Sequence, residues 1–155
     1  MAVVQLFGDS PRKLTDTGQC AMCGQEMRNG AHYTEFAILS LGAYGYAMPG
    51  LATCLLSPSS GRPGHTTPNA WMLDSRNGQL RHGGKGTDWS GQPRALNAGD
   101  CVGLLLDLDA GSLVVYVNGV KHGVIASGLK GPLFWAVDLM GSASVQIDGP
   151  KPPPI

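Results

Sequence analysis

The most regular pattern of apolar and polar positions lies at residues 101–125, and it predicts three consecutive strands. Apolar side chains recur at every second position over 102–108 and again over 113–117, as on the buried face of a β-strand. Residues 109–111 supply the first turn with a glycine, and Asn118-Gly119 supplies the second. An Asn-Gly pair between two β-rich runs favours a type I′ turn, which needs positive φ at both positions. The segment is therefore predicted to be a β-meander.

Shorter stretches on both sides of the meander predict further strands, and none predicts a long helix. No apolar pattern with a helical period extends beyond about ten residues. Many short strands with turn signals at regular spacing are typical of an all-β fold, a two-sheet antiparallel β-sandwich. Irregular structure or loops are expected at residues 19–30, 42–50, 57–69 and 83–99. Strands are expected at residues 3–7, 12–18, 31–41 and 51–56, around Trp71, and at 129–137.

Four segments along the chain, in the same order, resemble the SPRY family. The meander sequence LDLDAGSLVVYVNGVKHGVI is similar to the family's central signature of an aliphatic-aspartate strand, an aromatic strand and an Asn-Gly turn. Residues 30–36 resemble its opening strand, 71–85 its tryptophan strand and glycine hairpin, and 129–137 its closing strand. The resemblance implies two antiparallel sheets packed face to face in a bent, concanavalin-like arrangement.

Length and charge limit the domain count and the class of partner. At 155 residues the chain is predicted to be one domain, long enough to bury about two-thirds of its unfolded surface. The resemblance places a SPRY β-sandwich domain at residues 1–149, with its core at about 27–147 and a proline-rich tail at 150–155. Eleven basic residues balance 11 acidic ones, which argues against nucleic acid or an anionic membrane as a partner. Charged residues make up only 14% of the chain, so contacts through polar, apolar and backbone groups are expected.

The sequence shows no targeting or membrane-spanning segment. The N-terminal residues lack the basic and apolar regions of a signal peptide, and no apolar run approaches the ~20 residues that span a bilayer. The protein is therefore expected to be soluble, intracellular (cytoplasmic or nuclear) and monomeric. Cys54 and Cys101 sit in apolar settings and are expected to be small core residues, kept as thiols by a reducing cytosol.

The residues with catalytic or metal-binding potential are each better explained by structure. Cys20 and Cys23 form a CxxC motif without the second ligand pair that a structural zinc site needs, so two unpaired thiols in a loop are expected. The SPRY resemblance implies that His32 belongs to a structural strand opening, where its ring nitrogens would contact backbone groups. Asp107 and Asp109 flank a turn, where Asp side chains cap backbone N–H groups. No nucleophile and base are arranged for catalysis, so no enzyme activity, cofactor or metal is expected.

The resemblance implies a non-enzymatic protein-protein interaction module, of the kind that serves as a substrate-recruiting adaptor. In SPRY domains, loops at one end of the sandwich form a shallow groove for a short peptide or a loop of a partner, and segments 22–29, 44–48, 62–67 and 139–142 would build it here. Residues 139–141 resemble the aliphatic-Trp-Gly turn of the SOCS-box type of SPRY protein, with Met in place of Trp. Loop aromatic residues are frequent binding hot spots, and Met is an adaptable contact residue. The predicted partner-binding residues are Tyr44, Tyr46, Arg62, His65, Trp89, Leu139, Met140 and Gly141.

A lectin-like, carbohydrate-binding sandwich is the alternative function, since aromatic rings on loops can stack on sugars. Such a site would need a calcium-type cluster of Asp and Asn on adjacent loops, and only Asp88 and Asn69 come close. Trp71 and Trp135 lie inside predicted strands and are expected in the core. The predicted ligand is therefore a protein or peptide segment.

Overall fold

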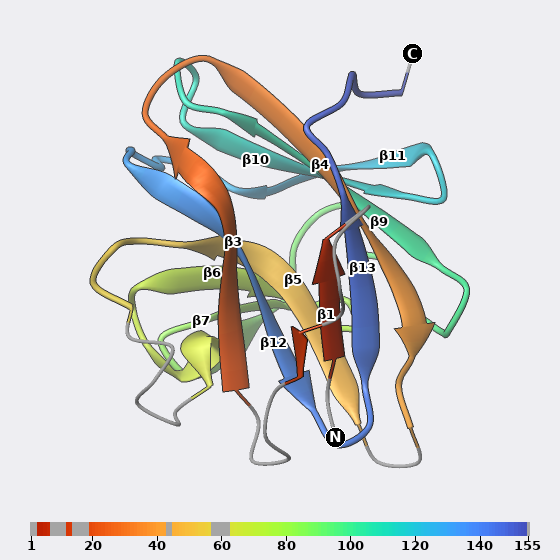
Figure 1. Cartoon of the computed structure of the whole chain (residues 1–155). Coiled ribbons are helices and arrows are strands. Elements are labelled where there is room, and N and C mark those ends of the chain that lie inside the picture. The colour runs from red at the N-terminus through yellow and green to blue at the C-terminus, as the bar shows by residue number, and fades with distance from the viewer. Residues whose placement is uncertain (1–2, 7–11, 14–18, 43–44, 57–62, 155) are drawn as a thin grey trace.

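The computed structural model describes residues 3–6, 12–13, 19–42, 45–56 and 63–154, which form a sandwich of two β-sheets (Figure 1). The strands are β1 (Val3–Leu6), β2 (Arg12–Lys13), β3 (Gln19–Met27), β4 (Ala31–Ser40), β5 (Tyr46–Ala52), β6 (Ala70–Leu73), β7 (Leu80–His82), β8 (Lys85–Thr87), β9 (Cys101–Asp107), β10 (Ser112–Val117), β11 (Val120–Ala126), β12 (Leu133–Met140) and β13 (Ser144–Asp148). One sheet has the order β11-β10-β9-β4-β13-β1-β2, and the other has the order β3-β12-β5-β6-β7-β8. A 3-10 turn, η2 (Gly64–Thr66), precedes β6. In the described part of the chain no helix is long and apolar enough to cross a membrane.

The predicted meander is confirmed as β9, β10 and β11, at one edge of the seven-stranded sheet. Asn118 has a φ of 51° and Gly119 a φ of 80°, the pair of positive angles that a type I′ turn needs. In the first turn, Asp107 Oδ1 accepts hydrogen bonds from the backbone N–H groups of Asp109 and Ala110, both at 3.0 Å. Asp107 therefore has the turn-capping role that the sequence predicts.

The main core lies between the two sheets and is built from alternate residues of each. On the seven-stranded sheet, Phe36 and Ile38 of β4 are almost completely buried. They belong to one apolar cluster with Leu51 of β5 and Val137 of β12, from the six-stranded sheet. Trp135 meets Phe36 edge-on, with ring centroids 6.4 Å apart, and is a core residue as predicted.

The six-stranded sheet differs from the sequence prediction in several places: β8 lies within the predicted loop 83–99, and residues 53–56 are not strand. Residues 19–27 form the edge strand β3 rather than an irregular segment, and β5 begins at Tyr46 rather than at residue 51. These strands are difficult to predict because β3 contains Gly24 and β5 contains Pro49 and Gly50, and glycine and proline are uncommon inside a strand. Gly50 is required in β5, because a Cβ there would lie 2.0 Å from the carbonyl oxygen of Trp71. The glycine thus allows close approach of β5 to β6 and does not mark a loop.

The first strand closes the sandwich by pairing with the last. β1 runs parallel to β13, with Val3 beside Ser144, and the two strands lie side by side in Figure 1. The residues after β13 pack on the same sheet. The backbone N–H of Lys151 donates to the Tyr33 carbonyl oxygen at 3.2 Å, and Lys151 Nζ donates to Glu35 Oε1 at 2.9 Å. The first strand and the residues after the last strand thus both belong to the seven-stranded sheet or pack on it.

Candidate functional site

The six-stranded sheet has a second buried cluster on its outer face, the face turned away from the seven-stranded sheet. Strand alternation places it there: in β5, Ala47 and Leu51 face the main core, whereas Tyr46 and Met48 face outward. β3, β6 and β12 contribute neighbouring side chains in the same way. The buried members are Cys20, Tyr46, Met48, Ala52, Leu56, Ala70, Met72 and Ala136, with Met22 and Met140 packed against them.

A buried carboxylate holds the η2 turn on this outer face. Asp138 of β12 is completely buried, and its two oxygens accept hydrogen bonds from the backbone N–H groups of Gly64 and His65, both at 2.8 Å. The same carboxylate lies 2.6 Å from His65 Nδ1. Gly64 fits closely, since a Cβ there would lie 3.0 Å from Met72 Cε. Asp138 therefore positions the His65 ring on the outer face.

Tyr46 contacts both His65 and an arginine. Its ring meets the His65 ring edge-on with centroids 5.7 Å apart, and Arg76 Cζ lies 4.8 Å from the centroid of the Tyr46 ring. Burial and, secondarily, the charge of Asp138 raise the pKa of Tyr46 to about 12, so its hydroxyl stays protonated at neutral pH.

The Tyr46 hydroxyl reaches the surface, although only 4% of the residue is exposed. Within the described part of the chain, no buried side-chain nitrogen or oxygen lacks a hydrogen-bond partner. The Tyr46 hydroxyl has no such partner there, so it cannot be one of the buried atoms. Among the described residues the hydroxyl is therefore slightly accessible and has no hydrogen-bond partner.

A second buried carboxylate positions the arginine. Asp74 is completely buried and accepts hydrogen bonds from Arg76 Nε and Nη2, at 3.1 and 3.0 Å, and from Arg81 Nε at 2.9 Å. Burial alone would raise the pKa of Asp74, but hydrogen bonds from Arg76 and the charges of both arginines outweigh burial and lower it. Half of the Arg76 side chain remains exposed, so its guanidinium is held in place at the surface.

The lowered pKa of Asp74 predicts a specific dependence of stability on pH. The stabilisation from its charge is fully present above the ordinary value of 3.8 and is lost as the pH falls through the lowered value of the folded protein. Replacing Asp74 with Asn should therefore flatten the acid limb of a plot of unfolding free energy against pH, measured by urea titration between pH 7 and the acid transition. An unchanged acid limb in the Asp74→Asn variant would contradict this role.

We call Tyr46, His65, Arg76 and Met140 the outer-face site. Tyr46 and Met140 are direct neighbours, because they pair across β5 and β12. Gly141 follows Met140 in the turn after β12 with a φ of 69°. The structure thus brings together three of the predicted contact residues, from three separate parts of the sequence, with Gly141 beside them.

Other predicted contact residues lie elsewhere. Leu139 is completely buried in the main core, because it alternates with Met140 along β12, and we exclude its side chain from the site. Trp89 packs against the main core, and its Nε1–H donates to the Gly78 carbonyl oxygen at 2.7 Å. Tyr44 and Arg62 lie outside the described residues.

Asp74, Arg76 and Asp138 are not among the contact residues predicted from the sequence. A signal was available for Asp138, which is a single carboxylate inside the apolar run Leu133–Met140 and would need partners if buried. Arg76 carries no comparable local signal. Its place over the Tyr46 ring depends on the tertiary position of Asp74.

The four cysteines lie in different environments, and their positions differ from those expected from the sequence. Cys20 and Cys23 lie in β3 rather than in the predicted loop, and they point to opposite faces of the sheet. Burial and the nearby charge of Asp138 raise the pKa of Cys20 far above its ordinary value, so the thiol stays protonated. Cys54 is exposed and Cys101 half-buried, so neither is the core residue expected. Among the described residues, no group of three or more His, Cys, Asp or Glu side chains could hold a metal.

Comparison with solved structures identifies the fold. No family model and no curated protein matches the sequence. The crystal structure of the SPRY domain of human HERC1 matches with a TM-score of 0.69 and 16% identity, over 83% of this chain and 79% of that chain. The crystal structure of a human SPRY domain matches with a TM-score of 0.71 and 21% identity, over 90% of this chain and 91% of that chain. These similarities do not support the SOCS-box subgroup. They confirm the predicted two-sheet β-sandwich, and the chain has the fold of SPRY domains.

Proposed function

We propose that the protein is a non-enzymatic interaction module that binds a short segment of a partner protein through the outer-face site. The observation that supports this most is the half-exposed Arg76 guanidinium, which Asp74 holds in place over the Tyr46 ring, beside a Tyr46 hydroxyl with no partner among the described residues. Polar groups fixed by buried carboxylates lose little conformational freedom on binding, which favours affinity. A role as a substrate-recruiting adaptor is part of the same proposal.

The chemistry of the site indicates what the partner segment offers. Tyr46 presents a hydroxyl, and Arg76 Nη1 has no partner among the described residues, so acceptor oxygens of the segment would bind there. Met140 is half-buried beside Tyr46 and would contact an apolar group. The carbohydrate-binding alternative gains no support, since Asp88 Oδ1 accepts a hydrogen bond from Gln79 Nε2 at 2.9 Å.

A peptide-display selection against the folded protein tests this proposal. We expect a short consensus to be enriched. The selected peptide should bind Tyr46→Phe about fivefold more weakly, because only the hydroxyl and its hydrogen bond are lost. It should bind Met140→Ala about tenfold more weakly or worse, as at an interface hot spot. Affinities would be measured by isothermal titration calorimetry.

The matched control is Val124→Ala, because Val124 is an exposed apolar residue on β11, in the other sheet. This variant should bind the selected peptide as the unmodified protein does. If no consensus is enriched, or if the Tyr46 and Met140 variants bind as well as the control while remaining folded, the outer-face site is not the binding surface.

A further inference from the structure

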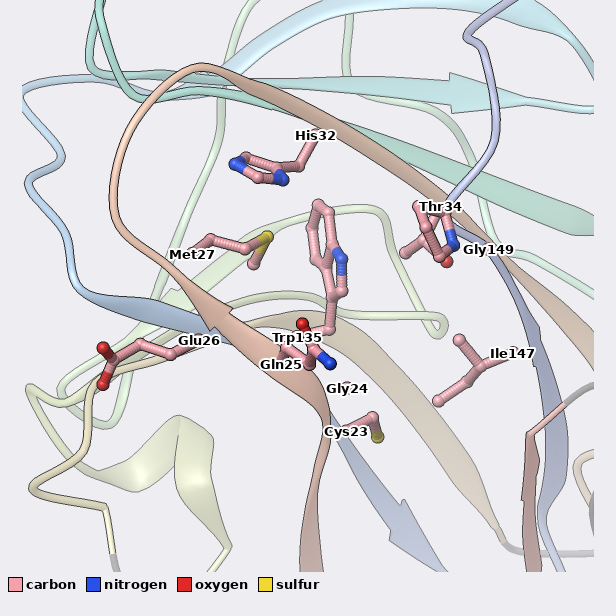
Figure 2. A pocket seen from close by; sticks show the side chains of 11 residues that line it. Cys23, Gly24, Gln25, Glu26, Met27, His32, Thr34, Trp135, Ile147 and Gly149 are labelled. Atoms are coloured by element: carbon pink, nitrogen blue, oxygen red, sulfur yellow. The ribbon is translucent and has the colours of Figure 1, made fainter.

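A cavity opens at the edge of the sandwich, on the main-core side of β3 and away from the outer-face site (Figure 2). Its volume is about 360 Å³, within the range of small-ligand sites, roughly 300–1,000 Å³. We call it the edge cavity. Its lining combines the apolar side chains of Cys23, Met27, Trp135 and Ile147 with the polar side chains of Gln25, Glu26, His32 and Thr34.

A bulge in β3 creates this cavity. Met27 pairs with Leu133 and Cys23 with Trp135, so four residue steps of β3 lie opposite two steps of β12. The extra residues disrupt the ladder and bend the strand. Gly24 within the bulge has a φ of 75°, a conformation that glycine adopts without strain. The edge of the sandwich is therefore held open beside the Trp135 ring.

The floor of the edge cavity is suited to an aromatic ring. The Trp135 ring stands in the cavity between Met27, Ile147 and Thr34 in Figure 2, and only 7% of the residue is exposed. Aromatic rings pack well against other rings in stacked or edge-on arrangements, and thioether sulfur contacts them favourably. A flat apolar ligand would thus find matching surfaces on Trp135 and Met27.

The cavity offers an acceptor nitrogen of His32, in addition to the exposed Gln25 amide and the Glu26 carboxylate, which pairs with Arg28. His32 Nε2 lies 2.7 Å from the Asn29 carbonyl oxygen, which can only accept, so Nε2 carries the proton and Nδ1 of the neutral ring is an acceptor. This confirms the predicted backbone contact of His32. Nδ1 has no partner among the described residues and is not one of their buried unsatisfied atoms. Figure 2 shows a nitrogen of this ring on the side that faces Trp135. Thr34 is already engaged, since its Oγ1 donates to the Asp148 carbonyl oxygen at 3.1 Å.

We propose that the edge cavity is a second binding site, which takes a planar aromatic ring carrying one N–H or O–H donor, such as an indole or a phenol. The ring would pack on Trp135 and Met27, and its donor would bind His32 Nδ1. The same chemistry is offered by a free small molecule and by a Trp or Tyr side chain of a partner. This site is independent of the outer-face site and of the function proposed for it.

Titration with indole, followed by ¹H–¹⁵N NMR of the three tryptophan indole groups, tests the proposal. We expect the Trp135 signal, assigned with a Trp135→Phe variant, to shift while those of Trp71 and Trp89 do not, with a dissociation constant of about 1 mM or below. 1-Methylindole lacks the donor and should bind about fivefold more weakly. In a His32→Phe variant, indole and 1-methylindole should bind equally.

The ligand pair keeps the test valid even if His32→Phe does not fold, because indole and 1-methylindole are compared on the unmodified protein. Val124→Ala serves as the control variant with unchanged indole binding. If Trp135 does not respond to indole up to its solubility limit, or if 1-methylindole binds as tightly as indole, the proposed site is wrong.

A third titration distinguishes the two sources of the ring. A blocked five-residue peptide with a central Trp can add backbone contacts along β3, which is the end strand of its sheet. Binding of this peptide tenfold or more tighter than indole would assign the cavity to a partner's side chain. Weaker or equal binding would assign it to a free small molecule.

Discussion

Replacing Asp138 with alanine is expected to lower the free energy of unfolding by about 3–5 kcal/mol, because it removes the acceptor of three hydrogen bonds at a buried site. The backbone N–H groups of Gly64 and His65 and the His65 ring all depend on this carboxylate. The η2 turn would lose its anchor on the outer face, so peptide binding at the outer-face site should be lost as well.

Urea unfolding of the Asp138→Ala variant, with the denaturation midpoint and slope both fitted, measures the stability change. Asp148→Ala is the matched control. Its side chain is 46% exposed and, among the described residues, bonds only Lys151 Nζ, at 3.3 Å, so its loss should cost less than about 1 kcal/mol. Equal costs for the two aspartates would show that the buried contacts of Asp138 add no stability.

Replacing Gly50 with alanine is expected to be still more damaging, with a loss of more than about 4 kcal/mol. The added Cβ would lie 2.0 Å from the Trp71 carbonyl oxygen and 2.7 Å from Met72 Cα. Both obstacles are backbone atoms of β6, which pairs with β5 at Gly50 and Met72. The two strands would have to separate, which breaks the centre of the six-stranded sheet.

Gly86→Ala provides the control for the Gly50 prediction, since both glycines lie in strands of the same sheet. A Cβ at Gly86 would lie 2.4 Å from Gln79 Oε1, the end of a flexible side chain that can move away. Thermal unfolding followed by circular dichroism should show a large fall in midpoint for Gly50→Ala and a small one for Gly86→Ala. A Gly50→Ala variant as stable as Gly86→Ala would contradict the close approach of β5 and β6.

The sequence predicts the strands whose stability is encoded locally and misses those that depend on a distant neighbour. Asn118-Gly119 specifies its turn through its own φ preferences, so the meander follows from the sequence. Gly50 does not specify its strand locally. Glycine is required at this position only because the Trp71 carbonyl oxygen lies so close in the folded chain. From the sequence alone, the strand that contains Gly50 is therefore predicted as a loop, and only its pairing with β6 explains the glycine.

The outer-face site shows the same limit. Aromatic and methionine composition pointed to Tyr46 and Met140, which pair across two strands. The alternation along β12 separates Met140 from Leu139, and no composition rule could assign the face before the strand was placed. Arg76 lies over the Tyr46 ring, and Tyr46 is distant in the sequence, so this contact exists only in the folded chain.

The parallel pairing of β1 with β13 also determines when the molecule can be completed during synthesis. Val3 and Ser144 pair although they are about 140 residues apart in the sequence. β4 also pairs with β13, so it cannot complete its pairing until β13 has been synthesised. A ribosome adds about 5–20 residues each second, so β1 and one side of β4 stay without their partner for several seconds or longer. High contact order of this kind slows folding. Unpaired strands on a nascent chain invite pairing with other chains, so this protein is expected to need chaperone protection until β13 has left the ribosome.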